Sequence, residues 1–358
     1  MLVLGVTGFV GYNYINSALR PIDAKSTEYV TVEIPAGSGS KAIGAALEEA
    51  GLIRNATVFN LYTQVKNYSG FQSGYYNLQK SMSVDELAKA LQKGGTETPQ
   101  LPVLAKLTIP EGYTLEQIAA TTAEATKNLA QKISSDDFMN KVQDETFINQ
   151  MVAKYPQLLA SLPTLESGVR YRLEGYLFPA TYNITSETTV ETLIDEMLGA
   201  MDTNLVGYYD QINAQNRTVN EVLSLASLVE KEGATDEDRK NIASVFFNRI
   251  AQGMPLQSNI AILYAQGKLG EATTLQEDAQ IDTNIDSAFN IYRNAGLMPG
   301  PVDSPSLSAI SAVISPNSTD YLYFVADVKT GKVYFANNYA DHEQNVTTYV
   351  NNQIAASN

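Results

Sequence analysis

The sequence contains no cysteine and a single histidine, His342. Without cysteine the chain can form no disulfide, no thiolate metal site and no cysteine nucleophile. One histidine excludes a metal site built from several histidines, and a Ser-His-Asp triad would have to use His342. A phosphate-binding loop of the form GxxxxGK[ST] is also absent. We therefore expect Asp and Glu carboxyl groups to carry out any acid–base chemistry. We expect no metal and no other cofactor.

Basic side chains are scarce relative to acidic ones. The chain has 24 Lys and Arg against 39 Asp and Glu, which gives a net charge of −15. Binding to nucleic acid requires a basic surface, so we exclude nucleic acid as a partner. The length of 358 residues and a hydrophobic content of 44% are typical of a globular protein with two or three domains and ample core.

The apolar run at the start of the chain, Met1–Tyr14, is shorter than the roughly 20 residues that span a bilayer. No basic segment precedes it and no clear cleavage site follows it, so it fits a signal peptide poorly. We interpret residues 1–22 as the remnant of a transmembrane anchor with its tether. This interpretation predicts a single-pass protein of the cell membrane. The alternative is a buried N-terminal helix.

The pattern predicts an α+β fold. Residues 23–104 read as a small strand–helix subdomain, and residues 105–358 as a mixed α/β domain with a helical linker at about 114–165. A weak repeat relates Val30–Leu47 to Ala105–Thr122, because both run strand, Ile-Pro-x-Gly, then helix. Such modules resemble LysM-type glycan-binding units. A plain packing module explains the same pattern equally well.

A helix beginning at Thr218 carries the strongest candidate for chemistry. Thr218 and Glu221 have the spacing of a capping box. Apolar residues follow at helical spacing, and the stripe that they form ends at Glu230. Burial disfavours the charged form of a carboxyl group and raises its pKa. We therefore expect Glu230 to hold a proton near neutral pH and to act as a general acid. The alternative is a solvated Glu in the last helical turn.

Three other segments could contribute to a site. The segment YRLEGYLFPATY places Glu174 among aromatic residues that include Tyr176, which suits sugar rings or, alternatively, core packing. Gln257, Ser258 and Asn259 form a polar loop between two predicted helices. A predicted hairpin, YLYFVADVKTGKVYFAN, is followed by Asn338 and His342. A lone His is more often structural than catalytic.

Five motifs occur in the chain in this order: LEGYLFPATY, ASLVEKEG, SVFFNRIAQGMPLQS, NIYRNAGLMPGPVDSPS and YLYFVADVKTGKVYFANNYADHEQNV. The same order is found in the YceG-like endolytic murein transglycosylases, and the chain resembles that family over about residues 29–350. The resemblance implies a LysM-like subdomain followed by a YceG-like catalytic domain. It also implies a membrane anchor and a catalytic domain on the extracytoplasmic side. That domain is expected to cleave peptidoglycan glycan strands and so end their elongation. Peptidoglycan synthases and elongation or division proteins are then expected partners.

The resemblance assigns the catalytic role to the first Glu of VEKE, which is Glu230 here. Polar and aromatic residues in or beside the motifs are candidates for substrate binding: Glu174, Tyr176, Glu232, Asn248, Gln257, Ser258, Asn259, Tyr292, Asn338 and His342. The chain departs from many members by having Asn259 and Ala180 where they have Asp. Those acidic positions cannot be required here, which strengthens the case for Glu230.

Three functions remain open at this stage. A lytic transglycosylase needs one carboxyl group, because Glu230 can protonate the glycosidic oxygen and then deprotonate the sugar's own C6 hydroxyl. A hydrolase of the same glycan would use Glu230 as acid and Glu174 as base or nucleophile. A protein that only binds or scaffolds the cell wall would use the LysM-like unit alone.

Overall fold

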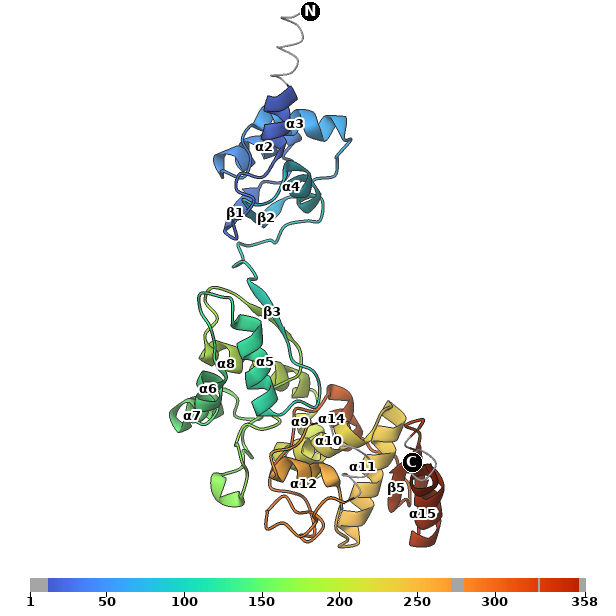
Figure 1. Ribbon diagram of the computed structural model, residues 1–358. Coiled ribbons are helices and arrows are strands. Elements are labelled where there is room, and N and C mark those ends of the chain that lie inside the picture. Colours follow the sequence, from blue (N-terminus) through green and yellow to red (C-terminus); the bar gives the residue numbers. More distant parts are fainter. Residues whose placement is uncertain (1–11, 272–279, 328, 354–358) are drawn as a thin grey trace, which may run out of the picture. The chain divides into compact units, whose positions relative to one another are not determined.

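The computed structural model describes residues 12–271, 280–327 and 329–353, and it has a mixed α+β fold of helices and small antiparallel sheets (Figure 1). The chain divides into two compact units, one ending at Leu104 and the other beginning at Ala105. Each unit has its own hydrophobic core.

The first unit packs helices against a two-stranded sheet. Its elements are β1 (Tyr29–Ile34), α2 (Ser40–Glu49), α3 (Ala56–Val65), β2 (Gly74–Gln79) and α4 (Val84–Leu91). The strands are antiparallel, with Tyr29 opposite Gln79 and Ile34 opposite Gly74. Alternate strand residues such as Val32 and Leu78 point into the core, as the period of a strand requires. The strand–helix character expected of residues 23–104 is confirmed.

The expected membrane anchor is not supported. We predicted a single-pass span, and hence a cell-membrane location, from the apolar run Met1–Tyr14. Within residues 12–271, 280–327 and 329–353, every helix lacks the length or the apolar character that a bilayer crossing demands. Residues 12–19 form a short helix in which Ala18 is buried and Leu19 packs against the core of the first unit. The prediction was therefore wrong, and residues 1–11 of that run lie outside the described part of the chain.

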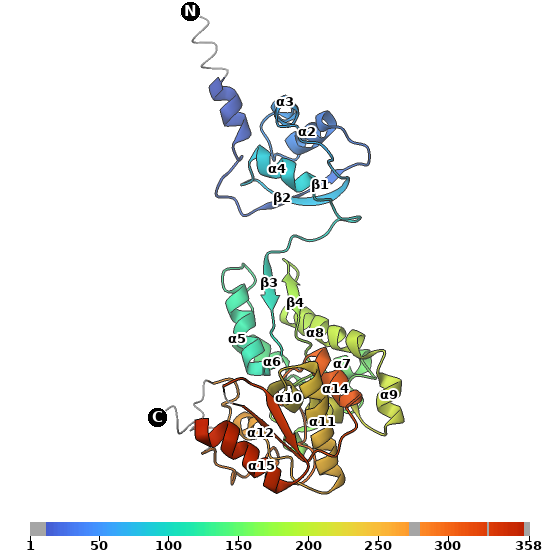
Figure 2. The same cartoon turned by 90° about the vertical axis from the view of Figure 1, so that its right-hand side faces the viewer.

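The second unit begins with a strand pair covered by helices. The strand β3 (Ala105–Thr108) pairs antiparallel with β4 (Thr181–Ile184), and α5 lies beside them in Figure 2. The helices of this part are α5 (Leu115–Thr126), α6 (Ser135–Lys141), α7 (Glu145–Lys154), η1 (Leu165–Ser167), α8 (Val190–Leu205) and α9 (Tyr209–Ala214). Buried residues of α6 and α7, such as Phe138 and Ile148, belong to the unit's common core.

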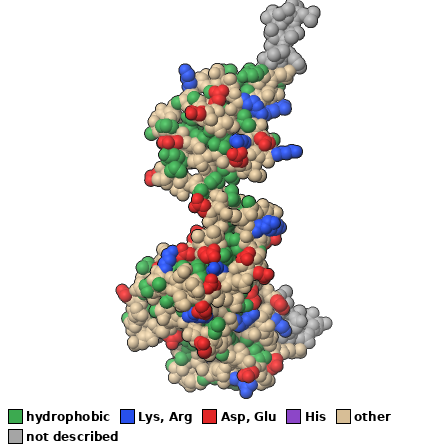
Figure 3. Space-filling view, turned by 90° about the vertical axis from the view of Figure 1, so that its left-hand side faces the viewer, with side chains coloured by type: hydrophobic (Ala, Val, Ile, Leu, Met, Phe, Trp, Pro, Cys, Tyr) green, Lys and Arg blue, Asp and Glu red, His purple; other side chains and the backbone are tan. Residues whose placement is uncertain are grey.

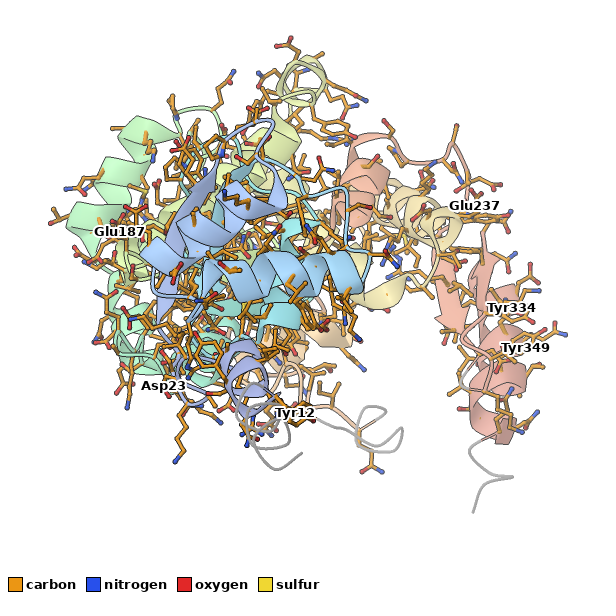
Figure 4. All side chains as sticks on the ribbon, turned by 90° about the horizontal axis from the view of Figure 1, so that it is seen from above. Tyr12, Asp23, Glu187, Glu237, Tyr334 and Tyr349 are labelled. Atoms are coloured by element: carbon orange, nitrogen blue, oxygen red, sulfur yellow. The ribbon has the colours of Figure 1, made fainter. Side chains whose placement is uncertain are left out.

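The remainder of the second unit is a helical cluster with a C-terminal hairpin. Its elements are α10 (Val219–Glu232), α11 (Asp236–Ala251), α12 (Asn259–Ala265), α14 (Leu307–Ile314), β5 (Tyr323–Ala326), β6 (Val333–Ala336), α15 (Tyr339–Val346) and η2 (Thr347–Asn351). Tyr323 pairs with Ala336 across the hairpin, which confirms the strand pair expected there. Tyr334 and Tyr349 stack with ring centroids 3.8 Å apart and lie beside each other in Figure 4.

The excess of acidic residues does not gather in one place on the face that Figure 3 shows. On that face, Asp and Glu side chains are scattered among uncharged and basic ones over both units. A scattered arrangement keeps like charges apart, so their mutual repulsion is weak at physiological salt.

Candidate functional site

The helix α10 positions Glu230. Thr218 and Glu221 form the capping box, each side chain accepting from the other's backbone N–H. Leu223 and Leu228 are fully buried, and burial of one leucine side chain contributes about 1.5–3 kcal/mol to folding. The buried face of the helix therefore holds its last turn in place, where the side chain of Glu230 is only 8% exposed.

Two neighbouring elements hold the Glu230 carboxyl group. Arg239 of α11 donates from Nη2 to Oε1 over 3.2 Å. Ser306, the N-cap of α14, donates to Oε2 from its backbone N at 3.0 Å and from its Oγ at 2.5 Å. A guanidinium and two further donors therefore converge on the group, and contacts of this kind stabilise the negative charge that appears when the proton leaves.

A glycine turn covers the same carboxylate. Gly112 has a φ of 71°, a backbone conformation that other residues rarely adopt. A Cβ at this position would lie 2.8 Å from Lys231 Nζ and 3.6 Å from Glu230 Cγ. The Gly112 backbone N donates to the carbonyl oxygen of Ser304 at 2.7 Å. The positive φ therefore favours glycine at this turn, which lies against the end of α10.

Four predicted substrate-binding residues lie in two hydrogen-bonded pairs. Ser258 caps α12 and donates from Oγ to Glu232 Oε1 over 2.8 Å. Tyr292 donates from Oη to Asn259 Oδ1 over 2.6 Å. Because Glu232 and Glu230 share the last turn of α10, the loop before α12 is tied to the same helix end.

Gln257 and His342 belong to a second cluster around Arg249, a residue that the sequence analysis did not select. The Arg249 guanidinium is buried, donates to the Leu256 carbonyl at 2.8 Å, and lies 5.1 Å from the centre of the Tyr323 ring. His342 stacks on that ring at 5.0 Å. Gln257, exposed and with a left-handed φ of 57°, points its Oε1 to Arg249 Nη1 at 3.5 Å. In the sequence, the signal for this cluster was Arg249 itself, a charged residue on the apolar stripe of α11.

Two predicted residues make structural contacts away from both groups. Asn248 donates to the carbonyl oxygens of Thr319 and Tyr321, each at 2.9 Å, and thereby attaches α11 to the segment before β5. Asn338 is the N-cap of α15 and accepts from Asp341 N. These contacts give both side chains a structural role.

Glu174 and Tyr176 are enclosed by protein. Glu174 is 1% exposed and accepts from the backbone N of Leu115 at 2.8 Å and from Tyr264 Oη at 3.0 Å. Burial raises the pKa of Glu174 to about 8. Tyr176 is fully buried and donates to Asn220 Oδ1. In this structure neither side chain has a surface to offer a ligand.

Asp303 is an acidic residue that the sequence analysis did not single out. It is fully buried, and neither carboxyl oxygen has a hydrogen-bond partner within the described residues. Burial raises the pKa of Asp303 well above its ordinary value, and the charges of Lys231, Glu230 and Glu174 also act on it. The available signal was a lone acid between Pro301 and Pro305 in the segment PGPVDSPS.

Comparison with known proteins supplies a family. Residues 32–348 match the model of the YceG-like family. The chain belongs to the YceG-like family. A crystal structure of a YceG-like protein from Listeria monocytogenes matches with a TM-score of 0.59 and 37% identity, covering 89% of this chain and 99% of that one.

Two YceG-like relatives carry a functional name. The endolytic murein transglycosylase of Streptococcus pneumoniae strain D39 is 60% identical over 354 residues, which cover 99% of this chain and 64% of the relative. The endolytic murein transglycosylase of Bacillus subtilis is 35% identical over 341 residues, covering 95% of this chain and 90% of the relative. The chain thus spans just under two thirds of the length of the pneumococcal relative.

Proposed function

We propose that this chain is a lytic transglycosylase that cleaves peptidoglycan glycan strands internally. The bond would be the one between N-acetylmuramic acid and N-acetylglucosamine, and the product would carry a 1,6-anhydro end. The observation that carries the proposal is the Glu230 carboxyl group, held by Arg239 and Ser306 at the end of α10. The names of the pneumococcal and Bacillus relatives support the substrate.

In the first step Glu230 donates its proton to the glycosidic oxygen, and the bond from that oxygen to C1 of the muramic acid breaks. Donation leaves a carboxylate on Glu230. Arg239 and the Ser306 N–H, at the N-terminal end of α14, stabilise that negative charge. These contacts favour proton release in the transition state, when the charge on Glu230 develops.

In the second step the Glu230 carboxylate removes the proton from the C6 hydroxyl of the same muramic acid. The C6 oxygen then bonds to C1 and closes the anhydro ring. Glu230 regains its proton, and no water is consumed. Because the attacking hydroxyl belongs to the sugar already bound, ring closure is intramolecular and needs no group to position water.

The enclosed position of Glu174 favours this reaction over hydrolysis. A hydrolase needs a second carboxylate that activates water or attacks the sugar. Glu174 is 1% exposed, and its two oxygens accept from Leu115 N and Tyr264 Oη. A group bound in this way holds the N-terminus of α5 and is closed to both water and sugar.

The first unit is proposed to be a LysM-like module that binds glycan. The order strand, helix, helix, strand from β1 to β2 supports this reading. A hollow of about 360 Å³ lined by Glu33, Tyr75 and Thr96 offers carboxylate, hydroxyl and aromatic groups to a sugar. Proteins that synthesise peptidoglycan or organise elongation and division are proposed as partners, because they would meet the same strands.

Mass spectrometry of glycan strands digested by the protein tests the proposal. We expect new ends that are one water lighter than hydrolysed ends, and early products of intermediate length because cleavage is internal. Ends at the hydrolysed mass would contradict the lytic reaction. Early release of disaccharides alone would contradict internal cleavage.

A further inference from the structure

The turn before α12 contains a residue in a backbone conformation that is costly for any side chain with a Cβ. Gln257 has a φ of 57°, in the left-handed region. Its side chain is exposed, whereas Leu256 and Ser258 on either side of it are buried. Strained residues of this kind persist only where the surrounding structure fixes them, and they gather at sites that bind ligands. Gln257 is therefore a candidate contact for a ligand.

Hydrogen bonds from two other segments fix the backbone of this turn. Arg249 of α11 is buried and donates from Nη1 to the Leu256 carbonyl oxygen at 2.8 Å. On the following residue, the Gln257 N–H donates to the Ile291 carbonyl oxygen at 3.1 Å. Both bonds end on backbone atoms of the turn, so they do not depend on the side chain at position 257. A substitution of Gln257 can therefore change the side chain and leave the turn in place.

The turn is attached to the helix end that carries the proposed catalytic residue. Ser258 donates from Oγ to Glu232 Oε1 over 2.8 Å, and Glu232 shares the last turn of α10 with Glu230. The two glutamates are two positions apart, and side chains at this spacing point to different faces of a helix. A sugar at Gln257 would therefore be a neighbour of the sugar at Glu230 in the same strand.

The contact with Arg249 determines which end of the Gln257 amide faces outward. A guanidinium group donates hydrogen bonds and accepts none, so the amide oxygen is the end that faces it. Accordingly, Gln257 Oε1 lies 3.5 Å from Arg249 Nη1. Within the part of the chain that the structure describes, Gln257 Nε2 has no hydrogen-bond partner. The group left for a ligand is this NH₂, which only donates.

We propose that Gln257 determines specificity by donating from Nε2 to the acetamido carbonyl oxygen of an N-acetylated sugar in the strand. The proposal rests on the proposed function, because that sugar adjoins the one at Glu230. A carbonyl oxygen only accepts, so it matches a group that only donates. After de-N-acetylation the sugar carries an ammonium group, which also only donates and leaves Nε2 without a partner. Gln257 thereby favours N-acetylated glycan.

Replacement of Gln257 by Glu should reverse this preference. One carboxylate oxygen can still accept from Arg249, and the other takes the place of Nε2 and accepts from an ammonium group. The substrates are glycan strands before and after chemical de-N-acetylation, compared at about pH 6, where an amine is charged. Relative to wild type, the ratio of the two kcat/KM values should move about tenfold toward the de-N-acetylated strands. The change should lie mainly in KM, because a contact with a neighbouring sugar is the same before and during the reaction.

Two further variants separate this contact from charge and strain. Gln252→Glu makes the same change at an exposed residue just after α11 and should keep the wild-type ratio. Gln257→Gly suits the left-handed φ and has no amide, so it should fold and give a ratio between those of wild type and Gln257→Glu. An equal ratio in wild type and Gln257→Glu would overturn the proposal. So would equal shifts in Gln252→Glu and Gln257→Glu.

A binding measurement that needs no cleavage separates this proposal from the proposed function. Calorimetry with oligomers of N-acetylglucosamine and of glucosamine, matched in length, reports the same preference. The wild type should bind the acetylated oligomer about tenfold more tightly, and Gln257→Glu should bind the glucosamine oligomer more tightly. The same preference in both proteins would overturn the role of Gln257 even if glycan is cleaved. A reversed preference without cleavage of peptidoglycan would uphold that role and refute the proposed function.

Discussion

Replacement of Ser306 by Ala probes the contact between the loop and Glu230. The hydroxyl caps α14 by accepting from Ala309 N at 3.1 Å and donates to Glu230 Oε2. Loss of an N-cap costs about 1 kcal/mol, and loss of a hydrogen bond to a charged group costs about 1.5–3 kcal/mol. Together they lower the free energy of unfolding by roughly 2.5–4 kcal/mol. At about 2–4 °C for each kcal/mol, the melting temperature should fall by about 5–15 °C.

Ser134→Ala is the matched control in the same unit. Ser134 caps α6, accepts from Asp137 N and donates to the Asp137 carboxylate, but this pair is exposed. An exposed pair of this kind contributes little beyond the cap, so a fall of about 2–4 °C is expected. Glycan cleavage should drop about tenfold in Ser306→Ala only, since one donor to a charged oxygen is lost. Equal melting temperatures and equal rates in the two variants would refute the reasoning and leave Ser306 as a cap alone.

Three further changes test the surroundings of the site. Burial raises the pKa of Glu174 to about 8, so its protonated form stabilises the fold below about pH 4.3, and that stability is lost as pH rises toward 8. The melting temperature of Glu174→Gln minus that of the wild type should therefore be larger at pH 8.5 than at pH 4. An equal difference in melting temperature at the two pH values would contradict the burial argument. Burial lowers the pKa of His342, so the stability that the neutral imidazole contributes above about pH 6.5 is lost on acidification. Between pH 7.5 and 5.5, His342→Gln should therefore lose less stability than the wild type. Gly175→Ala should destabilise the protein by about 1–3 kcal/mol, because the added Cβ would lie 2.3 Å from Pro301 Cβ and the φ at position 175 is positive. A denaturant midpoint equal to that of the wild type would contradict the close packing of Gly175 against Pro301.

Local features of the fold could be predicted from the sequence because their causes lie within a few residues. The capping box of Thr218 and Glu221 and the buried stripe of α10 are of this kind. The hairpin of β5 and β6 is another, since alternating strands flank a short turn. Such patterns depend on the period of the helix or strand and on turn chemistry.

The partners of Glu230 could not be predicted in the same way. Ser306 lies 76 positions further along the chain, and its contact depends on the path of the loop that precedes α14. The burial of Asp303 depends on the same path, and that of Glu174 on the approach of Leu115 and Tyr264. The sequence analysis left substrate binding and core packing open for Glu174, and the residues that bond its carboxyl group, Leu115 and Tyr264, come from distant segments.

The central claim is that Glu230 carries out the proton transfers, and the turnover of purified glycan strands by Glu230→Gln tests it most directly. Gln keeps the size of the side chain, and its one carbonyl oxygen can still accept from either Arg239 or Ser306, so a melt should show a folded protein. Loss of the acid–base group should lower the initial rate by about 10²–10⁴-fold. A folded Glu230→Gln protein that cleaves glycan at nearly the wild-type rate would contradict the account.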